Sequence, residues 1–331
     1  MKYFLIIQTA FIGDAILATA VMEKLHSYYP ESKIDILVRK GNEGLFTYHP
    51  YLNKCLIWNK SEGKYKSLFT TIQTIRINKY SHLINLHRFT SSGFLTAFSG
   101  ASEKIGFDKN PLSFLFTKRI KHSIGDGKHE VERNQLLIEH LTDSIFAKPK
   151  LYPRNEDENK INSLIKKPFI CMAPSSVWFT KQLPKEKWIE LISKINSSCT
   201  IYILGGKSDK TYCDEIIKES KAGNCVNLCG TLNLLQSAAL MQKAEMNYVN
   251  DSAPLHLCSA TNAPVTAFFC STIKDFGFGP LSEKAIVVET SEILDCRPCG
   301  LHGYKECPKG NFKCGFGISI NTTLIPETCR K

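Results

Sequence analysis

The fold is decided by the first fourteen residues, in which the apolar run YFLII at positions 3–7 leads into QTAFIGD at positions 8–14. A short continuous apolar run of this kind is typical of a parallel strand buried on both faces. Apolar residues then recur at three- and four-residue spacing from Ile16 to Leu25, and Pro30 precedes a second apolar run at 33–38. The segment therefore predicts a strand-helix-strand unit.

The same alternation continues along the chain, with a charged, proline-flanked stretch over 153–168 as the predicted domain boundary. We predict an α/β protein of two Rossmann-like doubly wound domains, 1–160 and 161–331, which face a central cleft and bind ligands at the carboxyl ends of their strands. Further strands are expected at 54–58, 82–86, 169–172, 200–204, 247–249 and 265–269, and helices at 68–77, 91–98, 188–195 and 209–220.

Composition excludes several classes of protein. The chain has 331 residues and 43% hydrophobic residues, enough for about two folded domains. No apolar run reaches the roughly 18 residues of a membrane span. The beginning of the chain could pass for a signal peptide, but Asp14 would interrupt the apolar core of that signal, so an intracellular, cytoplasmic protein is expected.

The charge balance points to an acidic partner. Lys and Arg number 42 against 31 Asp and Glu, a formal charge of +11, which suits nucleic acid, anionic lipid or a phosphorylated substrate. The sequence contains no helix-turn-helix, zinc-finger or RNA-recognition signature, so nucleic acid is not the expected partner.

Asp14 is the first candidate for chemistry. It lies with Gly13 between the first strand and the first helix, where backbone N–H groups and the helix dipole favour an anion or a reacting oxygen. A carboxylate at this place can take a proton from an attacking hydroxyl. Asp is equally a favoured helix N-cap, so a purely structural role remains open at this point.

The second half offers candidates for binding phosphate groups. Ser175 and Ser176 follow a predicted strand and precede Lys181, so hydroxyl donors and an ammonium gather near one strand end. Asp251 and Ser252 lie at a similar strand-to-helix junction, where either could cap the helix while free N–H groups bind a diphosphate. The accompanying residues are Ala253, His256 and the glycine turn Gly205-Gly206, which suits close approach of a ribose. Each stretch could also be an ordinary loop or turn, and His256 a core histidine.

A cysteine cluster lies near the end of the chain. The spacing C-x-x-C is compatible with a structural zinc site of four thiolates, whereas free thiols that pack a loop are the simpler interpretation. Disulfides are not expected in a cytoplasmic protein with an odd total of 13 cysteines. The cluster consists of Cys296, Cys299, Cys307 and Cys314.

Taken in order, these motifs resemble the family 9 glycosyltransferases, the bacterial lipopolysaccharide heptosyltransferases and their relatives. The resemblance rests on strand-Gly13-Asp14-helix, on Ser-Ser followed by Lys-x-x-Pro over 175–184, on Asn-Asp-Ser-x-x-x-His over 250–256, and on the late cysteines. It includes Lys-Ile-Gly-Phe at 104–107 and covers nearly the whole chain.

The resemblance implies a GT-B fold, with the acceptor bound by the N-terminal domain and the nucleotide sugar by the C-terminal domain. It implies inverting transfer without a metal or other cofactor, usually from ADP-heptose to a lipopolysaccharide core sugar. Asp14 matches the family's general base and Lys181 its diphosphate contact. The donor-site positions of the resemblance are Ser175, Ser176, Asp251, Ser252 and His256. Ser175-Ser176 and Ala253 stand where many relatives have a glycine, so the bound sugar or base can differ.

Acceptor recognition is predicted from charge alone. Arg88, Lys118 and Arg119 are the candidates for an anionic core sugar or lipid A precursor. The expected place of work is the cytoplasmic surface of the inner membrane, held by electrostatics. Three alternatives stay open: a GT-B transferase that uses another nucleotide sugar for a surface glycan, a non-enzymatic basic zinc-containing binding module, and, more distantly, a nicotinamide oxidoreductase, which lacks the expected G-x-G-x-x-G.

Overall fold

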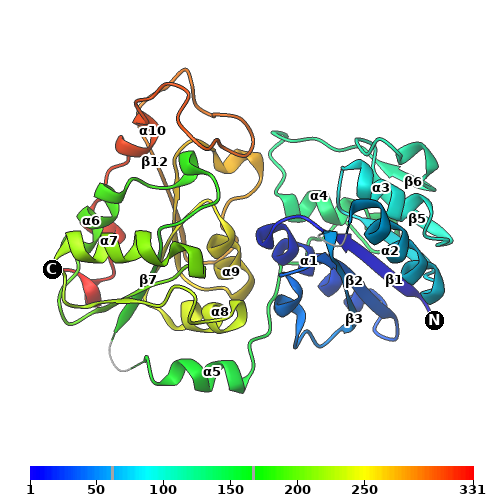
Figure 1. Cartoon of the computed structure of the whole chain (residues 1–331), viewed down its shortest axis with the longest axis horizontal. Helices are drawn as coiled ribbons and strands as arrows, with labels where there is room; N and C mark the ends of the chain where they lie inside the picture. Colours follow the sequence, from blue (N-terminus) through cyan, green and yellow to red (C-terminus); the bar gives the residue numbers. More distant parts are fainter. Residues whose placement is uncertain (61–62, 166–167) are drawn as a thin grey trace. The chain divides into compact units, whose positions relative to one another are not determined.

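The computed structural model of the chain describes residues 1–60, 63–165 and 168–331. Within these residues the chain forms two compact units, unit 1 (Met1–Tyr152) and unit 2 (Pro153–Lys331). Each unit contains a six-stranded sheet in which neighbouring strands are parallel (Figure 1). The predicted pair of doubly wound, Rossmann-like folds is therefore confirmed.

Unit 1 has the strand order β3-β2-β1-β4-β5-β6. The order reverses between β1 and β4, which pair from Phe4↔His82 to Ile7↔Asn85. The interior residues of β1 are buried on both faces, which is why this strand reads as a continuous apolar run. The elements are β1 (Tyr3–Gln8), α1 (Ile12–Tyr28), β2 (Lys33–Arg39), β3 (Leu52–Trp58), α2 (Lys64–Asn78), β4 (His82–Asn85), α3 (Thr90–Ala97), β5 (Glu103–Phe107), η3 (Ser113–Leu115), β6 (Lys118–Ile120) and α4 (Glu130–Leu136).

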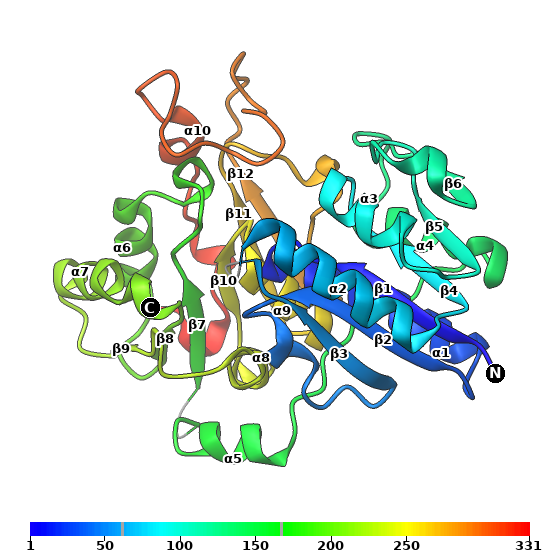
Figure 2. The ribbon, with the colours of Figure 1, turned by 45° about the vertical axis from the view of Figure 1, so that its right-hand side comes forward.

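Helices cover both faces of this sheet. Helix α1 packs with α4, whereas α2 packs with α3, and two views show α2 and α3 side by side (Figures 1 and 2). One apolar side of α2 faces the core: Ile75 is buried and Leu68 and Ile72 pack against the same core cluster. Both α2 and α3 begin at the carboxyl edge of the sheet, because each follows a parallel strand.

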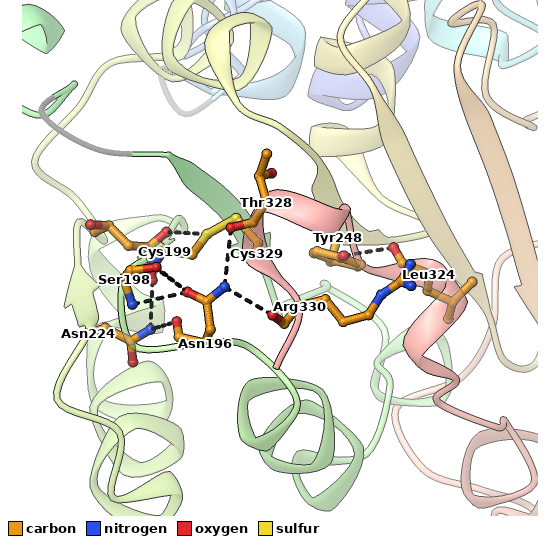
Figure 3. Close-up of a disulfide and its surroundings, with 10 residues drawn as sticks. Asn196, Ser198, Cys199, Asn224, Tyr248, Leu324, Thr328, Cys329 and Arg330 are labelled. Atoms are coloured by element: carbon orange, nitrogen blue, oxygen red, sulfur yellow. Dashed lines mark hydrogen bonds between the residues drawn. A yellow bond between two sulfur atoms is a disulfide. The ribbon is translucent and has the colours of Figure 1, made fainter.

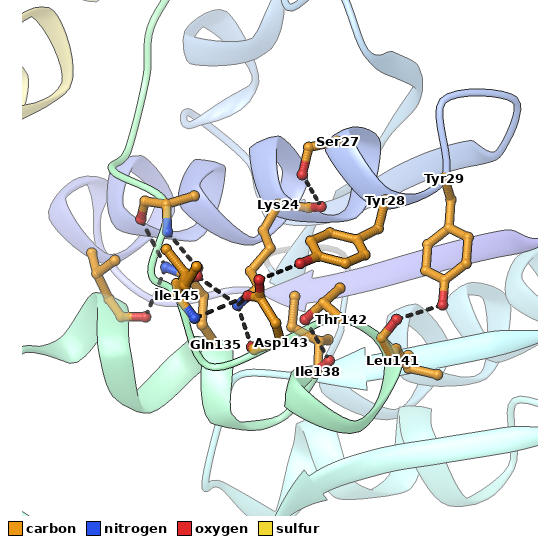
Figure 4. A network of polar contacts seen from close by, with 12 residues as sticks. Lys24, Ser27, Tyr28, Tyr29, Gln135, Ile138, Leu141, Thr142, Asp143 and Ile145 are labelled. Carbon is orange, nitrogen blue, oxygen red and sulfur yellow. Dashed lines mark hydrogen bonds and ion pairs between the residues drawn. The ribbon is translucent and has the colours of Figure 1, made fainter.

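A polar network fixes helix α1, whose first turn carries Asp14. Lys24 is almost fully buried, and its Nζ donates to the carbonyl oxygens of Asp143 and Ile145 at 2.5 and 2.7 Å and pairs with the Asp143 carboxylate at 3.0 Å (Figure 4). Tyr28 donates to the same carboxylate, and Tyr29 donates to the carbonyl oxygen of Leu141 at 2.5 Å. This buried cation is therefore satisfied, and the segment after α4 holds the end of α1 in place.

Unit 2 repeats the topology, with the strand order β12-β11-β10-β7-β8-β9. The order reverses between β7 and β10, so these two carboxyl ends form the switch point where ligands of such sheets bind. The elements are α5 (Asn155–Asn162), β7 (Phe169–Ala173), η5 (Phe179–Lys181), α6 (Lys185–Ser193), β8 (Thr200–Ile203), η6 (Lys207–Asp209), α7 (Lys210–Ser220), β9 (Cys225–Asn227), α8 (Leu234–Lys243), β10 (Asn247–Asn250), α9 (Ala253–Thr261), β11 (Val265–Phe269), β12 (Ala285–Glu289), α10 (Lys313–Phe316), η8 (Thr322–Leu324) and η9 (Glu327–Cys329).

The charged stretch predicted as a linker contains a helix. Helix α5 belongs to unit 2 and packs on α8, where Lys243 Nζ lies 2.8 Å from Glu158 Oε2. Three acidic residues in its first turn, Glu156, Asp157 and Glu158, complement the positive end of the helix dipole. The two units accordingly divide between Tyr152 and Pro153 rather than at residue 160. Residues 166–167 of the same stretch lie outside the described residues.

The end of the chain is fastened to the core of unit 2 by a disulfide, which corrects the expectation that disulfides are absent. Cys199, just before β8, is bonded to Cys329 in η9 (Figure 3). Asn196 supports the junction, since its backbone N–H donates to the Cys329 carbonyl at 2.9 Å and its side chain donates to Arg330 O at 3.1 Å. The prediction rested on an expected cytoplasmic location, and the sequence does not show that these two thiols lie side by side in the fold.

Candidate functional site

The carboxyl end of β1 in unit 1 holds Asp14. Helix α1 starts at Ile12 and its N-cap is Phe11, so Asp14 is the third residue of the helix, partly exposed in the first turn. The alternative that Asp14 is the N-cap residue is therefore wrong. The preceding loop is held by Asn42, whose Nδ2 donates to Ala10 O at 3.2 Å, and by Gln8, whose Oε1 accepts from the Ala10 N–H at 3.2 Å. A carboxylate in a first helical turn lies close to unpaired backbone N–H groups that favour its charge.

His87 and Arg88 lie in the loop that follows the neighbouring strand β4. Asn85 Oδ1 accepts from the His87 N–H at 2.9 Å, and Asn110 Nδ2 donates to the carbonyl of His87 at 3.2 Å, so this loop is fixed. Burial, helped by the charges of Lys60 and Arg88, lowers the pKa of His87 to about 4. The imidazole is therefore neutral at pH 7, and Arg88 supplies the positive charge beside it.

A second histidine, His122, has a similar environment. Burial, Arg88 and Arg133 together lower its pKa to about 4. Arg133 is itself buried and pairs with Glu130 at 2.9 Å, while burial raises the pKa of that carboxyl group. Arg88 and Lys60 thus carry positive charge beside neutral histidines, whereas the nearby Arg133 is paired with Glu130.

The other two predicted acceptor residues lie elsewhere in unit 1. Lys118 and Arg119 belong to β6, the edge strand, whereas Asp14 and Arg88 follow the adjacent strands β1 and β4. The structure therefore brings Asp14, Gly13 and Arg88 to neighbouring strand ends and places Lys118 and Arg119 two strands further along the sheet. Arg119 is exposed and Lys118 is partly exposed.

In unit 2, Asn250 organises the strand ends at the switch point. This residue ends β10 and is fully buried. Its Nδ2 donates to Pro174 O at 2.7 Å, and its Oδ1 accepts from the Leu183 N–H at 2.9 Å. The amide thereby joins the segment after β7, which carries Ser175 and Ser176, to the residues that directly follow Lys181 at the end of η5.

The next residue, Asp251, forms an ion pair at this edge. Its Oδ2 lies 2.7 Å from Lys181 Nζ and accepts from Thr272 Oγ1 at 2.7 Å. Both partners of the ion pair are mostly buried, with 16% of the Lys181 side chain and 6% of the Asp251 side chain exposed. Asp251 therefore orients the ammonium rather than capping α9.

The two serines after β7 offer hydroxyl groups. Ser175 Oγ is buried beside the Cys213 thiol and makes no hydrogen bond to nitrogen or oxygen among the described residues, so it can still bond a ligand oxygen. The Ser176 carbonyl accepts from Gln182 Nε2 at 2.7 Å, which folds the loop back on itself. These hydroxyls are compatible with phosphate oxygens.

Helix α9 begins beside the Lys181–Asp251 pair. Ser252 occupies its N-cap position but makes no side-chain cap bond, so its hydroxyl does not satisfy the helix N–H groups, and Ala253 is the first helical residue. His256, one turn further, is 5% exposed and its ring lies 6.3 Å from that of Phe278. Of the two residues predicted as possible caps, neither caps the helix through its side chain.

The glycine turn Gly205-Gly206 follows β8. A Cβ on Gly205 would lie 2.9 Å from Cys229 Sγ and 3.0 Å from Asp209 Cβ, so packing requires a glycine there. The Gly206 N–H donates to Asp209 Oδ2 at 2.7 Å. This turn follows the strand next to β7, at the carboxyl edge of the sheet.

The segment that carries Cys296, Cys299 and Cys307 packs against Lys181 and its neighbours, a contact that was not predicted from the sequence. The Tyr304 N–H donates to Thr180 Oγ1 at 2.7 Å, and the Thr180 N–H donates to the Tyr304 carbonyl at 3.1 Å. A Cβ on Gly303 would lie 2.9 Å from Lys181 Cγ. Arg297 donates to Cys270 O at 2.7 Å and to Thr272 O at 2.9 Å. The closely spaced cysteines were the only sequence feature that drew attention to this segment.

The same segment was the candidate for zinc. Cys299 and Cys314 have raised pKa values, first through burial and then through the other thiols of the cluster, so the four cysteines lie in one region. Over residues 1–60, 63–165 and 168–331, no group of three or more His, Cys, Asp or Glu side chains is arranged to hold a metal ion. The zinc alternative, which included Cys296 and Cys307, gains no support from this geometry.

A search of the described helices for one long and apolar enough to cross a membrane finds none.

Comparisons with known proteins agree with this architecture. The model of glycosyltransferase family 9 (heptosyltransferase) matches residues 68–305. Lipopolysaccharide heptosyltransferase 3 of Escherichia coli K12 is 27% identical over 289 residues, which cover 83% of this chain and 84% of that protein.

Two solved structures share the fold. A family 9 glycosyl transferase from Veillonella parvula superposes with a TM-score of 0.78 at 20% identity, covering 86% of this chain and 85% of that one. The ADP-heptose lipopolysaccharide heptosyltransferase II of Escherichia coli superposes with a TM-score of 0.73 at 20% identity, covering 90% and 96%.

Proposed function

Because the chain belongs to glycosyltransferase family 9, the heptosyltransferase family, and is a glycosyltransferase, we propose that it transfers a heptose from ADP-heptose to a lipopolysaccharide core acceptor. The named relative acts as a lipopolysaccharide heptosyltransferase, which supports this choice of sugar and acceptor. The proposed place of work is the cytoplasmic surface of the inner membrane.

The observation that carries the proposal is the Lys181–Asp251–Thr272 arrangement at the switch point of unit 2. A nucleoside diphosphate needs a positive charge where the leaving group accumulates negative charge. Lys181 is held at that edge by Asp251, and the same edge carries the hydroxyl of Ser175 and the start of α9. Gly205 and Gly206 are proposed to contact the ribose, and Ser176, Ser252, Ala253 and His256 to complete the donor site.

In unit 1, Asp14 is the proposed general base. It removes the proton of an acceptor hydroxyl as the oxygen attacks the anomeric carbon from the face opposite the diphosphate, so one displacement inverts the configuration. The new C–O bond forms as the bond to the diphosphate breaks, and ADP leaves with the electron pair. Arg88 is proposed to bind an anionic group of the acceptor, with Gly13 near its hydroxyl and Lys118 and Arg119 as outer contacts.

The charge on the leaving group is proposed to be stabilised by Lys181 and backbone N–H groups, so turnover needs no metal ion. The departures at Ser175-Ser176 and Ala253 bear on the donor site only, and a different nucleotide sugar for a surface glycan is the competing transferase function.

The test measures acceptor-dependent release of ADP from ADP-heptose, with a heptose-deficient lipopolysaccharide core as acceptor. We expect release by the wild type in the presence of EDTA and a loss of at least a hundredfold in kcat for Asp14→Asn. Glu31→Gln, which changes an exposed acidic residue shortly after α1, is the matched control and should retain activity.

Three results would contradict the proposal in different places. Release from UDP- or GDP-sugars but not from ADP-heptose would replace the donor. Full activity of Asp14→Asn would remove the general base. Loss of activity with EDTA that Mg²⁺ restores would show a metal requirement.

A further inference from the structure

Exposed aromatic and aliphatic side chains gather on α2, α3 and the η3 segment of unit 1. Tyr65 and Phe69 on α2 are 80% and 62% exposed, and Phe114 in η3 is 67% exposed. Large apolar side chains this exposed carry a free-energy cost in water when they form a patch. We call this surface the α2–α3 patch, and its members are Tyr65, Phe69, Phe94, Phe98, Phe114 and Leu115.

The aromatic residues of α2 lie on one flank of the helix, the flank next to α3. Tyr65, Phe69 and Arg76 are spaced by four and seven residues, which places them on one side. Arg76 Nη1 donates to the carbonyl oxygen of Phe98 at 3.3 Å, so this side borders α3. Figures 1 and 2 show the two helices side by side.

On α3 the patch continues. The rings of Phe94 and Phe98 stack with centroids 5.9 Å apart, and both are partly exposed. The loop before η3 packs against the same helix, since a Cβ on Gly93 would lie 3.1 Å from Leu112 Cβ. The three elements are therefore contiguous.

Most of the net positive charge of the chain falls in the stretch of sequence that contains the patch. Residues 51–121 contain 12 Lys and Arg against three Asp and Glu, an excess of nine out of the total of +11. Lys66 on α2 and Lys109, Arg119 and Lys121 near η3 are exposed. Such an excess attracts an anionic surface and repels a second copy of this chain.

We propose that the α2–α3 patch docks unit 1 on an anionic phospholipid bilayer. Aromatic side chains are favoured at the membrane–water interface, and surrounding lysines and arginines are attracted to anionic headgroups. A nucleic acid would be bound mainly through the charge, whereas a bilayer interface also takes up the large apolar side chains of the patch. The proposal deepens the proposed function and rests on it for the identity of the membrane, because a lipid-anchored acceptor lies at such a surface.

The place of the patch in unit 1 suits that role. Helices α2 and α3 begin at the carboxyl edge of the sheet, the edge that also carries Asp14 and Arg88. Tyr65 lies in the first turn of α2, near this edge. A bilayer bound at the patch would bring its headgroups close to the proposed acceptor residues.

The test is co-sedimentation of the full chain with vesicles of phosphatidylcholine, with and without phosphatidylglycerol. We expect binding that requires phosphatidylglycerol and falls with added salt. The double variants Tyr65→Ser/Phe69→Ser and Lys66→Glu/Lys109→Glu should each weaken binding at least fivefold. Val226→Ser/Ile293→Ser and Lys218→Glu/Lys284→Glu change exposed apolar and basic residues of unit 2 and should bind like the wild type.

Three outcomes would overturn the docking surface: no binding to either vesicle, equal loss in the unit 2 variants, or binding to heparin with none to vesicles, which would indicate a polyanion site. A parallel assay with deacylated, water-soluble core oligosaccharide separates this proposal from the transferase function. Patch variants that transfer normally to the soluble acceptor but lose vesicle binding support docking. Failure of transfer by the wild type would contradict the function and leave the vesicle result standing.

Discussion

Lys181 Nζ lies 2.7 Å from Asp251 Oδ2, and the same oxygen accepts a hydrogen bond from Thr272 Oγ1 at 2.7 Å. The lysine comes from η5, the aspartate follows β10 and the threonine follows β11, so three segments far apart in sequence meet at one carboxylate. Because the ion pair is mostly buried, each charge depends on its partner for solvation. The ammonium is thus held in place at the strand edge before any ligand binds.

Replacing Lys181 should therefore affect both stability and donor binding, and the two effects can be separated. Lys181→Met leaves the Asp251 carboxylate buried with a single hydroxyl donor, so we expect a loss of about 2–3 kcal/mol in the free energy of unfolding. The double variant Lys181→Met/Asp251→Asn should regain most of that stability. Affinity for ADP, measured by calorimetry, should fall about tenfold or more in both. Recovery of ADP binding in the double variant would contradict the role of the lysine.

Gly303 should be needed for the position of Lys181, and Gly310 provides a matched control. Gly303 has φ +76° and a Cβ there would lie 2.9 Å from Lys181 Cγ and from Thr180 Oγ1, whereas Gly310 has φ +69° with no atom within 4 Å. Both alanine variants carry the left-handed strain of roughly 1 kcal/mol. Only Gly303→Ala should also weaken ADP binding, by several-fold. Equal ADP affinity of the two variants would show that the contact with the lysine is unimportant.

The alternating pattern of apolar runs and helical spacing was enough to predict both doubly wound sheets. Buried parallel strands such as β1 and β7 are continuous apolar runs, and this signal is local. Short strands at the sheet edges were harder, since β6 contains Lys118 and Arg119 and β9 is partly polar. Helix α5 was missed because its acidic first turn resembles a solvated linker.

The residues of the candidate site that follow the carboxyl ends of strands could be identified from the sequence. Asp14 and Asp251 follow strands whose carboxyl ends could be found from the pattern, and their approximate environment followed from topology. The contacts that fix Lys181 could not be found, because Thr272, Gly303 and Tyr304 reach it through tertiary packing that no spacing encodes. The same is true of the Cys199–Cys329 disulfide, which joins residues separated by 130 positions.

Breaking that disulfide should destabilise unit 2. A cross-link over 130 residues removes loop entropy from the unfolded chain worth about 5 kcal/mol on the entropic model. We expect the melting temperature to fall by roughly 10–20 °C in a thiol reductant and in the double variant Cys199→Ala/Cys329→Ala. Differential scanning calorimetry checks this, with the reductant added to the double variant as control. A further fall in the variant would show that the reductant acts elsewhere.

The stability of unit 1 should fall as the pH decreases from neutral, because of His49. Burial, with contributions from His26 and Lys150, lowers the pKa of His49 to about 4, against 6.5 in the unfolded chain. The unfolded state therefore binds more protons between these values, so the stability that the neutral imidazole provides is complete above pH 6.5 and is lost as the pH falls towards 4. At pH 5 the loss from this residue is about 2 kcal/mol.

Urea unfolding at pH 7.5 and pH 5 measures this dependence while most carboxyl groups stay ionised. His49→Gln should reduce stability at pH 7.5, because the ring packs against Tyr51 and Tyr152 with centroids 5.7 and 5.0 Å away. The same variant should lose less stability than the wild type between the two pH values, by about 2 kcal/mol. An unchanged difference would mean that His49 is protonated in the folded protein at pH 5, in conflict with its burial.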